Sequence, residues 1–256
     1  RLRYSRNVRP LGSPENWNAA MRLARAPLVK ILHHDDWLAE PYSLRTLVSL
    51  LDDHPTAGLA FSATRNTSSP EIPGWLHCPS GKDLKMLERD PRIILLGNFI
   101  GAPSVTIHRN QLGLEFDSRL KWLVDIDFYA RVLRQCQGFA WSEQPLVCTY
   151  IAEREARVTD SCLGNPDVEL RETGLVWNKF FVKDIPRALW FPALNMWSRL
   201  MAVFRVKNLL ALEHMAGCSL NPRWQFLGAF LLSLPRRLMR ACRFARLTGG
   251  QVEPAC

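Results

Sequence analysis

Through the first 160 residues of the chain, short apolar runs alternate with segments in which apolar residues recur at the spacing of an amphipathic helix. The runs at 28–32 and 58–63 have the length and apolar content of buried strands. Further strands are expected at 1–6, 104–108 and 145–150, and helices at 13–25, 40–53, 82–90 and 122–135. This alternation predicts an α/β domain in which helices flank a sheet.

Two local signals fix boundaries within this pattern. Ser13 is placed at the N-cap of the helix at 13–25, Pro14 at its first helical position and Glu15 in its first turn. Residues 66–80 contain several Pro, Ser and Thr residues, which predict a loop.

The run at 28–32 ends abruptly in four polar residues, His33, His34, Asp35 and Asp36. In open α/β sheets, ligands bind at the carboxyl ends of the strands. Two adjacent carboxylates at such an end form a hard oxygen site that suits Mg²⁺ or Mn²⁺. The alternative is a solvated loop in which Asp35 or Asp36 caps the next helix.

Two more carboxylates, Asp125 and Asp127, lie near the start of the helix at 122–135. Positions two residues apart are separated by about 200° around a helix, so both cannot face one pocket. Asp127 precedes Arg131 by four residues, the favourable order for a surface ion pair, and is assigned to structure. Asp125 is therefore the candidate for chemistry. Its alternative is a carboxylate that the helix dipole stabilises.

The composition allows one domain plus an appendage. The chain has 256 residues, 47% of them hydrophobic, and seven scattered cysteines without a Cys-x-x-Cys motif. This use of cysteine favours free thiols in a reducing compartment over disulfides or a zinc site. Because no apolar run reaches about 18 residues, we expect no membrane-spanning helix.

The formal charge of +9 is concentrated near the carboxyl end. Residues 187–247 contain ten Lys or Arg and one acidic residue, interleaved with aromatic side chains. We therefore predict a helical, basic region over 161–256, with an amphipathic part suited to an anionic membrane surface. The alternative is a set of packed helices with a solvated basic face. Nucleic acid is not expected as a partner, because no nucleic-acid motif accompanies the charge.

An ordered set of motifs links these features. The set comprises Leu11-Gly12, Asn18, Ala24, the run at 28–32, Asp35-Asp36-Trp37-Leu38, Gly101-Ala102-Pro103-Ser104, Phe116-Asp117 and Val124-Asp125-Ile126-Asp127. In this order it resembles the family 2 glycosyltransferases of the GT-A fold. Two positions depart from the family: His33 replaces its first acidic residue, and Val124 replaces the Glu of its Glu-Asp pair.

The resemblance implies a GT-A-like domain over 1–160 with a mixed, Rossmann-like sheet. It implies inverting transfer of a sugar from a nucleotide-diphosphate sugar to a saccharide or lipid-linked acceptor. Asp36 would hold Mg²⁺ or Mn²⁺, and Asp125 would be the catalytic base. The implied donor-binding residues are Asn18, Asp35, Gly101, Ser104 and Arg157.

The resemblance also implies a setting and its alternatives. Family members begin with a βαβ unit that binds the nucleotide base; because none precedes residue 1, we expect an amino-terminally incomplete chain. A role in cell-envelope polysaccharide synthesis is expected, in the cytoplasm or at the inner face of the membrane. Specificity would lie in the loops at 66–80 and 152–165. The alternatives are a catalytically incomplete module and an adaptor that binds a membrane or a partner through the basic region.

Overall fold

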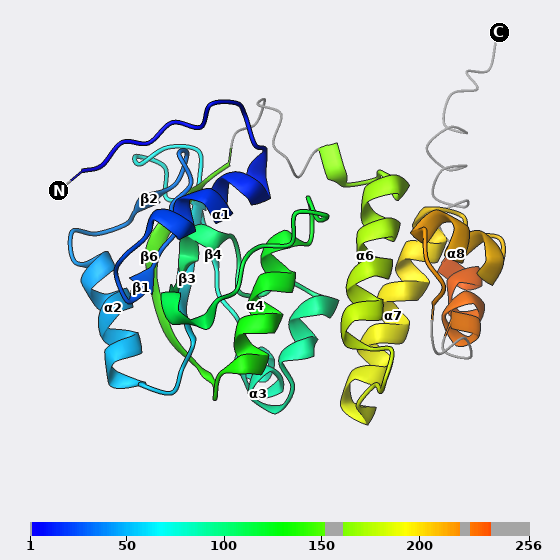
Figure 1. The fold of residues 1–256 in the computed structure, drawn as a ribbon. Coiled ribbons are helices and arrows are strands. Elements are labelled where there is room, and N and C mark those ends of the chain that lie inside the picture. The colour runs from blue at the N-terminus through cyan, green and yellow to red at the C-terminus, as the bar shows by residue number, and fades with distance from the viewer. Residues whose placement is uncertain (1, 152–160, 221–225, 237–256) are drawn as a thin grey trace, which may run out of the picture. The chain divides into compact units, whose positions relative to one another are not determined.

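The computed structural model describes residues 2–151, 161–220 and 226–236 (Figure 1). The chain divides into two compact units, residues 1–160 and 161–256. The first unit is a sheet with helices, and the described part of the second is helical. The α/β architecture expected for the first unit is therefore confirmed.

The sheet of the first unit is mixed. Its strands are β1 (Leu28–Val29), β2 (Trp37–Leu38), β3 (Leu59–Thr67), β4 (Trp75–His77), β5 (Thr106–Arg109) and β6 (Phe139–Tyr150). Their order is β1-β5-β3-β6-β2, and β4 pairs with β3 off this path. Only the pairing of β3 with β6 is parallel among the described strands. As a result, β1, β3 and β6 run in the same direction and end at the same edge of the sheet.

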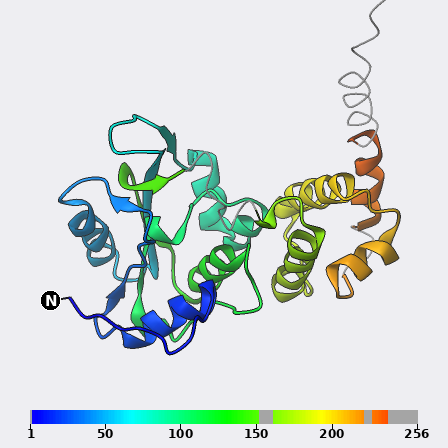
Figure 2. The ribbon, with the colours of Figure 1, turned by 90° about the horizontal axis from the view of Figure 1, so that it is seen from above.

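Helices cover both faces of this sheet. They are α1 (Ser13–Leu23), α2 (Ser43–Asp53), α3 (Gly81–Arg89) and α4 (Val124–Gln135), with 3-10 turns η1 (Pro91–Leu96), η2 (Pro103–Val105) and η3 (Asn110–Leu112). Figures 1 and 2 both show α2 on one side of the sheet and α4 on the other. Leu47 and Leu51, one turn apart on α2, are fully buried against Ala60, Ile107 and Leu146 of the strands.

The prediction of a strand at 1–6 is wrong. Residues 2–12 have no regular structure, and the side chains of Leu2 and Tyr4 are 99% and 85% exposed. A strand needs a partner for its backbone groups, and this segment pairs with none of the described strands. The N-cap of α1 is Gly12 rather than Ser13.

Two other segments differ from expectation. The run at 28–32 forms a strand only over its first two residues, because the chain leaves the sheet to reach the turn at His33. The segment 66–80 is not only a loop, since β4 pairs with the end of β3. Gly74 makes the return possible: its φ is +63°, and a Cβ there would lie 2.2 Å from the Asn66 carbonyl oxygen.

An aromatic core holds the second unit together. Its described helices are α6 (Pro166–Phe180), α7 (Arg187–Val203), α8 (Leu209–Ala216) and a helical stretch at 226–236. Trp177, Trp197 and Phe226 pack edge to face with ring centroids 5.0–5.6 Å apart. Phe181 stacks on Trp177 at 4.6 Å. Much of the aromatic content that suggested a membrane surface is therefore buried within the unit.

The basic stretch is described only in part. Arg236 donates to the carbonyl and side-chain oxygens of Asn195, whereas the arginines after it lie outside the described residues. On the preceding helical turns, Leu227, Leu231 and Leu234 are 41–62% exposed at a spacing that places them on one face. None of the described helices combines the length and apolar character that crossing a bilayer requires.

Candidate active site

A cavity of about 1150 Å³ lies in the first unit. Its walls come from α1, residues 28–36, the carboxyl ends of β3 and β6, η2 and the start of α4. Because β1, β3 and β6 end at the same edge, segments that are far apart in sequence meet there. This is the edge at which α/β sheets bind ligands.

The turn at 33–36 is anchored at three points. Asp36 N–H donates to the His33 carbonyl at 3.2 Å and closes the turn. His33 N–H donates to Ser104 Oγ at 2.9 Å, and Tyr150 N–H donates to Asp36 Oδ1 at 3.1 Å. The turn is thus tied to η2 on one side and to β6 on the other, which fixes the direction of its side chains.

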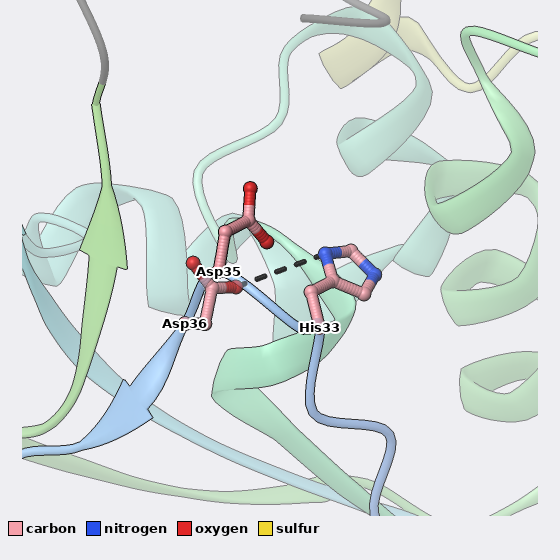
Figure 3. Close-up of side chains that lie close together, drawn as sticks. All are labelled: His33, Asp35 and Asp36. Carbon is pink, nitrogen blue, oxygen red and sulfur yellow. Dashed lines mark ion pairs between the residues drawn. The ribbon is translucent and has the colours of Figure 1, made fainter.

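Three of these side chains converge, as Figure 3 shows. Potential ligand atoms of His33, Asp35 and Asp36 all lie within 4.8 Å of one another. The side chain of Asp36 is only 2% exposed, and Asp35 is more open at 41%. Asp36 Oδ2 is buried and makes no hydrogen bond within the described residues. A buried carboxylate oxygen that accepts no hydrogen bond and lies near other potential metal ligands fits a bound cation.

Burial and charge oppose each other at this turn. Burial raises the pKa of the Asp36 carboxyl, against the effects of the neighbouring Ser104 hydroxyl and the Tyr150 amide. Burial likewise lowers the pKa of His33, against the attraction of the Asp36 carboxylate. Each group is therefore held in an environment that disfavours its own charge. A positive ion between them would favour the carboxylate form of Asp36 and the neutral form of His33, the two forms that bind metals.

Lys30 brings a positive charge to the cavity wall. Its ammonium donates to the carbonyl of Ser104 and, at 3.4 Å, to that of Thr106. Burial lowers the pKa of Lys30 to about 8, and the Asp36 carboxylate partly opposes this shift. Lys30 thereby ties the strand-to-turn segment to the segment that carries Ser104.

Asp125 enters the cavity wall from the first turn of α4. Asn98 Nδ2 donates to Asp125 Oδ2 at 3.2 Å and to the Gly101 carbonyl at 3.2 Å, while Gly101 N–H donates to Asn98 Oδ1 at 2.9 Å. Gly101 has a φ of +110°, a conformation that favours glycine. The Gly101 turn therefore positions Asp125 through Asn98.

Only some of the residues predicted to bind the donor line the cavity. Asp35 and Asp36 line the cavity, whereas Asn18, Gly101 and Ser104 do not. Asn18 is buried, and its amide pairs with the backbone N–H and carbonyl of Phe116 at 2.7 and 2.9 Å. Arg157 lies outside the described residues.

The ion pair expected of Asp127 forms, but not at the surface. Arg131 Nε donates to Asp127 Oδ2 at 2.8 Å, and the Asp127 side chain is 0% exposed. The expectation of a surface pair is wrong because α4 turns this face inward. Asp127 does not line the cavity, whereas Asp125 does, in agreement with their angular separation on the helix.

The sequence analysis missed several side chains at the cavity. Trp17 of α1 stacks on the His33 ring at 5.2 Å with an interplanar angle of 18°. Trp75 of β4 lines the cavity while 57% exposed. Lys30 had a visible signal, a charged residue inside an apolar run. The roles of Trp17 and Trp75 depend on long-range packing, which the local pattern does not contain.

The chain is similar to one curated protein over part of its length and to one kind of solved structure in its fold. No protein-family model matches it. Over 146 residues it is 33% identical to the uncharacterized protein MT1568 of Mycobacterium tuberculosis (strain CDC 1551 / Oshkosh). That match covers 51% of this chain and 44% of the relative, which is less than half of the relative's length.

Among solved structures, the chain is similar to the crystal structure of S. aureus TarS 1–349 in complex with UDP-GlcNAc. The TM-score is 0.50 at 12% identity, covering 94% of this chain and 74% of that chain. This similarity concerns the fold alone, and it confirms the GT-A-like fold expected from the sequence. Membership of family 2 and an incomplete amino terminus remain predictions.

Proposed function

We propose that the protein is a glycosyltransferase that moves a sugar from a nucleotide-diphosphate sugar to a saccharide or lipid-linked acceptor. The observation that carries the proposal is the buried Oδ2 of Asp36, which accepts no hydrogen bond within the described residues and lies beside His33 and Asp35 in a cavity that Asp125 also lines. The GT-A-like fold and the S. aureus TarS structure with bound UDP-GlcNAc support a nucleotide-sugar donor.

Asp36 would hold a divalent cation, Mg²⁺ or Mn²⁺, with Asp35 beside it or in contact with the donor ribose or sugar. A bound divalent ion would neutralise the charge that builds up on a leaving diphosphate. The Tyr150 amide keeps Asp36 Oδ1 in place and leaves Oδ2 for the ion. Arg157 is proposed to contact phosphate oxygens. Asn18, Gly101 and Ser104 would act through the segments that they hold in position.

Asp125 would act as the base. Its carboxylate accepts the proton of an acceptor hydroxyl as that oxygen bonds to the anomeric carbon of the donor. The bond from the anomeric carbon to the diphosphate oxygen breaks, and its electron pair leaves with the nucleoside diphosphate. A single displacement of this kind inverts the anomeric centre. Asn98 holds one carboxylate oxygen of Asp125 and so orients the base.

The test of this function is calorimetric titration of the chain with UDP, GDP, ADP and CDP in the presence of Mn²⁺. We expect saturable binding of one of these nucleotides, which EDTA abolishes. Flat traces for all four nucleotides, from protein shown to be folded by circular dichroism, would contradict the proposal. That result would favour the alternative of a catalytically incomplete module.

Replacing Asp125 with Asn should lower turnover by about a hundredfold or more, because general-base catalysis contributes roughly 10²–10⁴-fold. Nucleotide affinity should stay unchanged, since Asp125 is not one of the clustered residues proposed to hold the cation. The measurement is the rate of nucleoside diphosphate release at saturating donor, once donor and acceptor are identified. Asp53→Asn, an exposed carboxylate on α2, is the matched control. A turnover loss accompanied by an equal loss of nucleotide affinity would count against the base role.

Trp75 is proposed to stack on the acceptor saccharide. An exposed indole at a cavity wall offers a flat apolar face to the C–H face of a sugar ring. Trp75→Ala should raise the acceptor KM about tenfold, since an aromatic contact contributes about 1.4 kcal/mol. Leu76→Ala is the control, because Leu76 is equally exposed at 55% but does not line the cavity. Equal effects of the two substitutions would contradict the stacking role.

A membrane-binding role of the second unit is the second candidate. The exposed stripe of Leu227, Leu231 and Leu234 favours it, together with the basic residues of the region. Such binding would bring the enzyme to a lipid-linked acceptor at the inner face of the membrane. Cosedimentation of the full chain with anionic vesicles at low salt tests it, and absence of binding there would exclude this role.

A further inference from the structure

We propose that His33 is a direct metal ligand and that it shifts the metal preference of this site from Mg²⁺ toward transition-metal ions. The inference rests on the proposed function, because it concerns the same site. It goes beyond that function by assigning the imidazole and a metal class. The argument starts from the distance between His33 and Asp36.

The distance between the His33 and Asp36 side chains is too long for a hydrogen bond and suitable for two ligands of one ion. His33 Nδ1 lies 3.7 Å from Asp36 Oδ2 (Figure 3). Direct hydrogen bonds between nitrogen and oxygen are about 2.7–3.2 Å long. Two ligands at about 2.1 Å from one ion are about 3.0 Å apart when adjacent and about 4.2 Å apart when opposite. The observed separation lies between these limits.

The imidazole is held in place before any ion binds. Its ring stacks on Trp17, and its backbone N–H donates to Ser104 Oγ. The side chain is only 24% exposed, so the surrounding protein restricts the positions that the ring can take. Asp35, at 41% exposure, has more freedom to move toward an ion. The site therefore offers one fixed nitrogen, one fixed carboxylate oxygen and one adjustable carboxylate.

This donor set discriminates between metals. Mg²⁺ prefers oxygen ligands and water in octahedral geometry. An imidazole nitrogen instead favours first-row transition-metal ions, and affinity rises from Mn²⁺ to Co²⁺ in the usual order. A carboxylate at position 33 would give an all-oxygen site suited to Mg²⁺. His33 replaces that carboxylate with a nitrogen donor, so Co²⁺ and Mn²⁺ should bind more tightly than Mg²⁺.

The test is calorimetric titration of the full chain with Co²⁺, Mn²⁺ and Mg²⁺, without nucleotide or sugar. We expect Co²⁺ to bind most tightly and Mg²⁺ most weakly. His33→Asp should reduce the ratio of Co²⁺ to Mg²⁺ affinity by at least about tenfold, the lower end of the effect of losing a group that supports a metal site. In a second measurement, the visible absorption spectrum of bound Co²⁺ should change in His33→Asp.

His34 provides the matched control. It is the next residue and is 97% exposed, and although its Nδ1 lies 3.8 Å from Asp35 Oδ1, it is not one of the three clustered ligand residues. His34→Asp adds the same negative charge nearby, so it should leave both the affinity ratio and the Co²⁺ spectrum unchanged. Equal changes in the two variants would show a charge effect and overturn the proposal, as would absence of Co²⁺ binding to the folded chain. Selective Co²⁺ binding without any nucleotide binding would support this metal assignment while contradicting the transferase.

Discussion

Replacing Asp36 with Ala is expected to lower turnover by roughly a thousandfold and to remove the Mn²⁺-dependent binding of nucleoside diphosphates. The stabilisation that a bound metal supplies amounts to several kcal/mol, and each 1.36 kcal/mol corresponds to about a factor of ten. Asp36 is the buried member of the cluster, with one oxygen fixed by Tyr150 and the other without a hydrogen bond. The measurements are the rate of nucleoside diphosphate release and calorimetric titration in Mn²⁺.

Because Asp36 also accepts a hydrogen bond, its loss could disturb the turn. Asp36→Asn addresses this, since an amide oxygen can still accept from the Tyr150 N–H while the negative charge is gone. Both variants should lose metal-dependent binding, and the Asn variant should keep the wild-type melting temperature more closely. Asp53→Ala on the exposed face of α2 should behave as wild type. Full turnover in Asp36→Asn would contradict the metal assignment.

The position of the site at one edge of the sheet follows from local patterns. The polar turn after the run at 28–32 and the acidic start of the helix at 122–135 are both visible in the sequence. A general rule about strand ends was enough to bring Asp35 and Asp36 to the ligand-binding edge. The resemblance to a family supplied the expectation that Asp125 shares their site.

The long-range hydrogen bonds that hold the site together could not be predicted from local patterns. Asn18 pairs with Phe116, 98 positions away, and Ser104 holds the turn at His33 across 71 positions. Such bonds depend on the order and register of strands, which apolar periodicity does not encode. Periodicity also shows which residues share a helix face, but not whether a polar face points to solvent or to the interior. It therefore gave the spacing of Asp127 and Arg131 on α4 correctly, but not the burial of their ion pair.

In the second unit, the sequence pattern does not distinguish a membrane surface from a buried helical core. Aromatic residues interleaved with basic ones suit a membrane surface, but they equally suit a small helical core. The structure assigns Trp177, Trp197 and Phe226 to the core, while Trp190 and Phe191 are exposed. A sequence alone does not separate these groups, because the helices that cover them are distant in the chain.

Replacing Trp177 with Ala is expected to reduce the free energy of unfolding of the second unit by about 3–5 kcal/mol, the usual cost of removing a large buried aromatic side chain. Trp177 is 2% exposed and contacts three aromatic rings, Phe181, Trp197 and Phe226. Trp190→Ala, at a position that is 48% exposed, should cost less than about 1 kcal/mol. Guanidinium unfolding of the full chain, followed by circular dichroism, measures both changes.

The same two variants separate a core from a membrane anchor. If Trp177 serves only the core, its loss should destabilise the unit, while any vesicle binding by the molecules that remain folded stays unchanged. Trp190→Ala should do the reverse and weaken vesicle binding, because an exposed indole is the kind that enters a lipid interface. A small and equal destabilisation by both substitutions would contradict the aromatic core. The aromatic residues of the second unit would then have to act mainly at an interface.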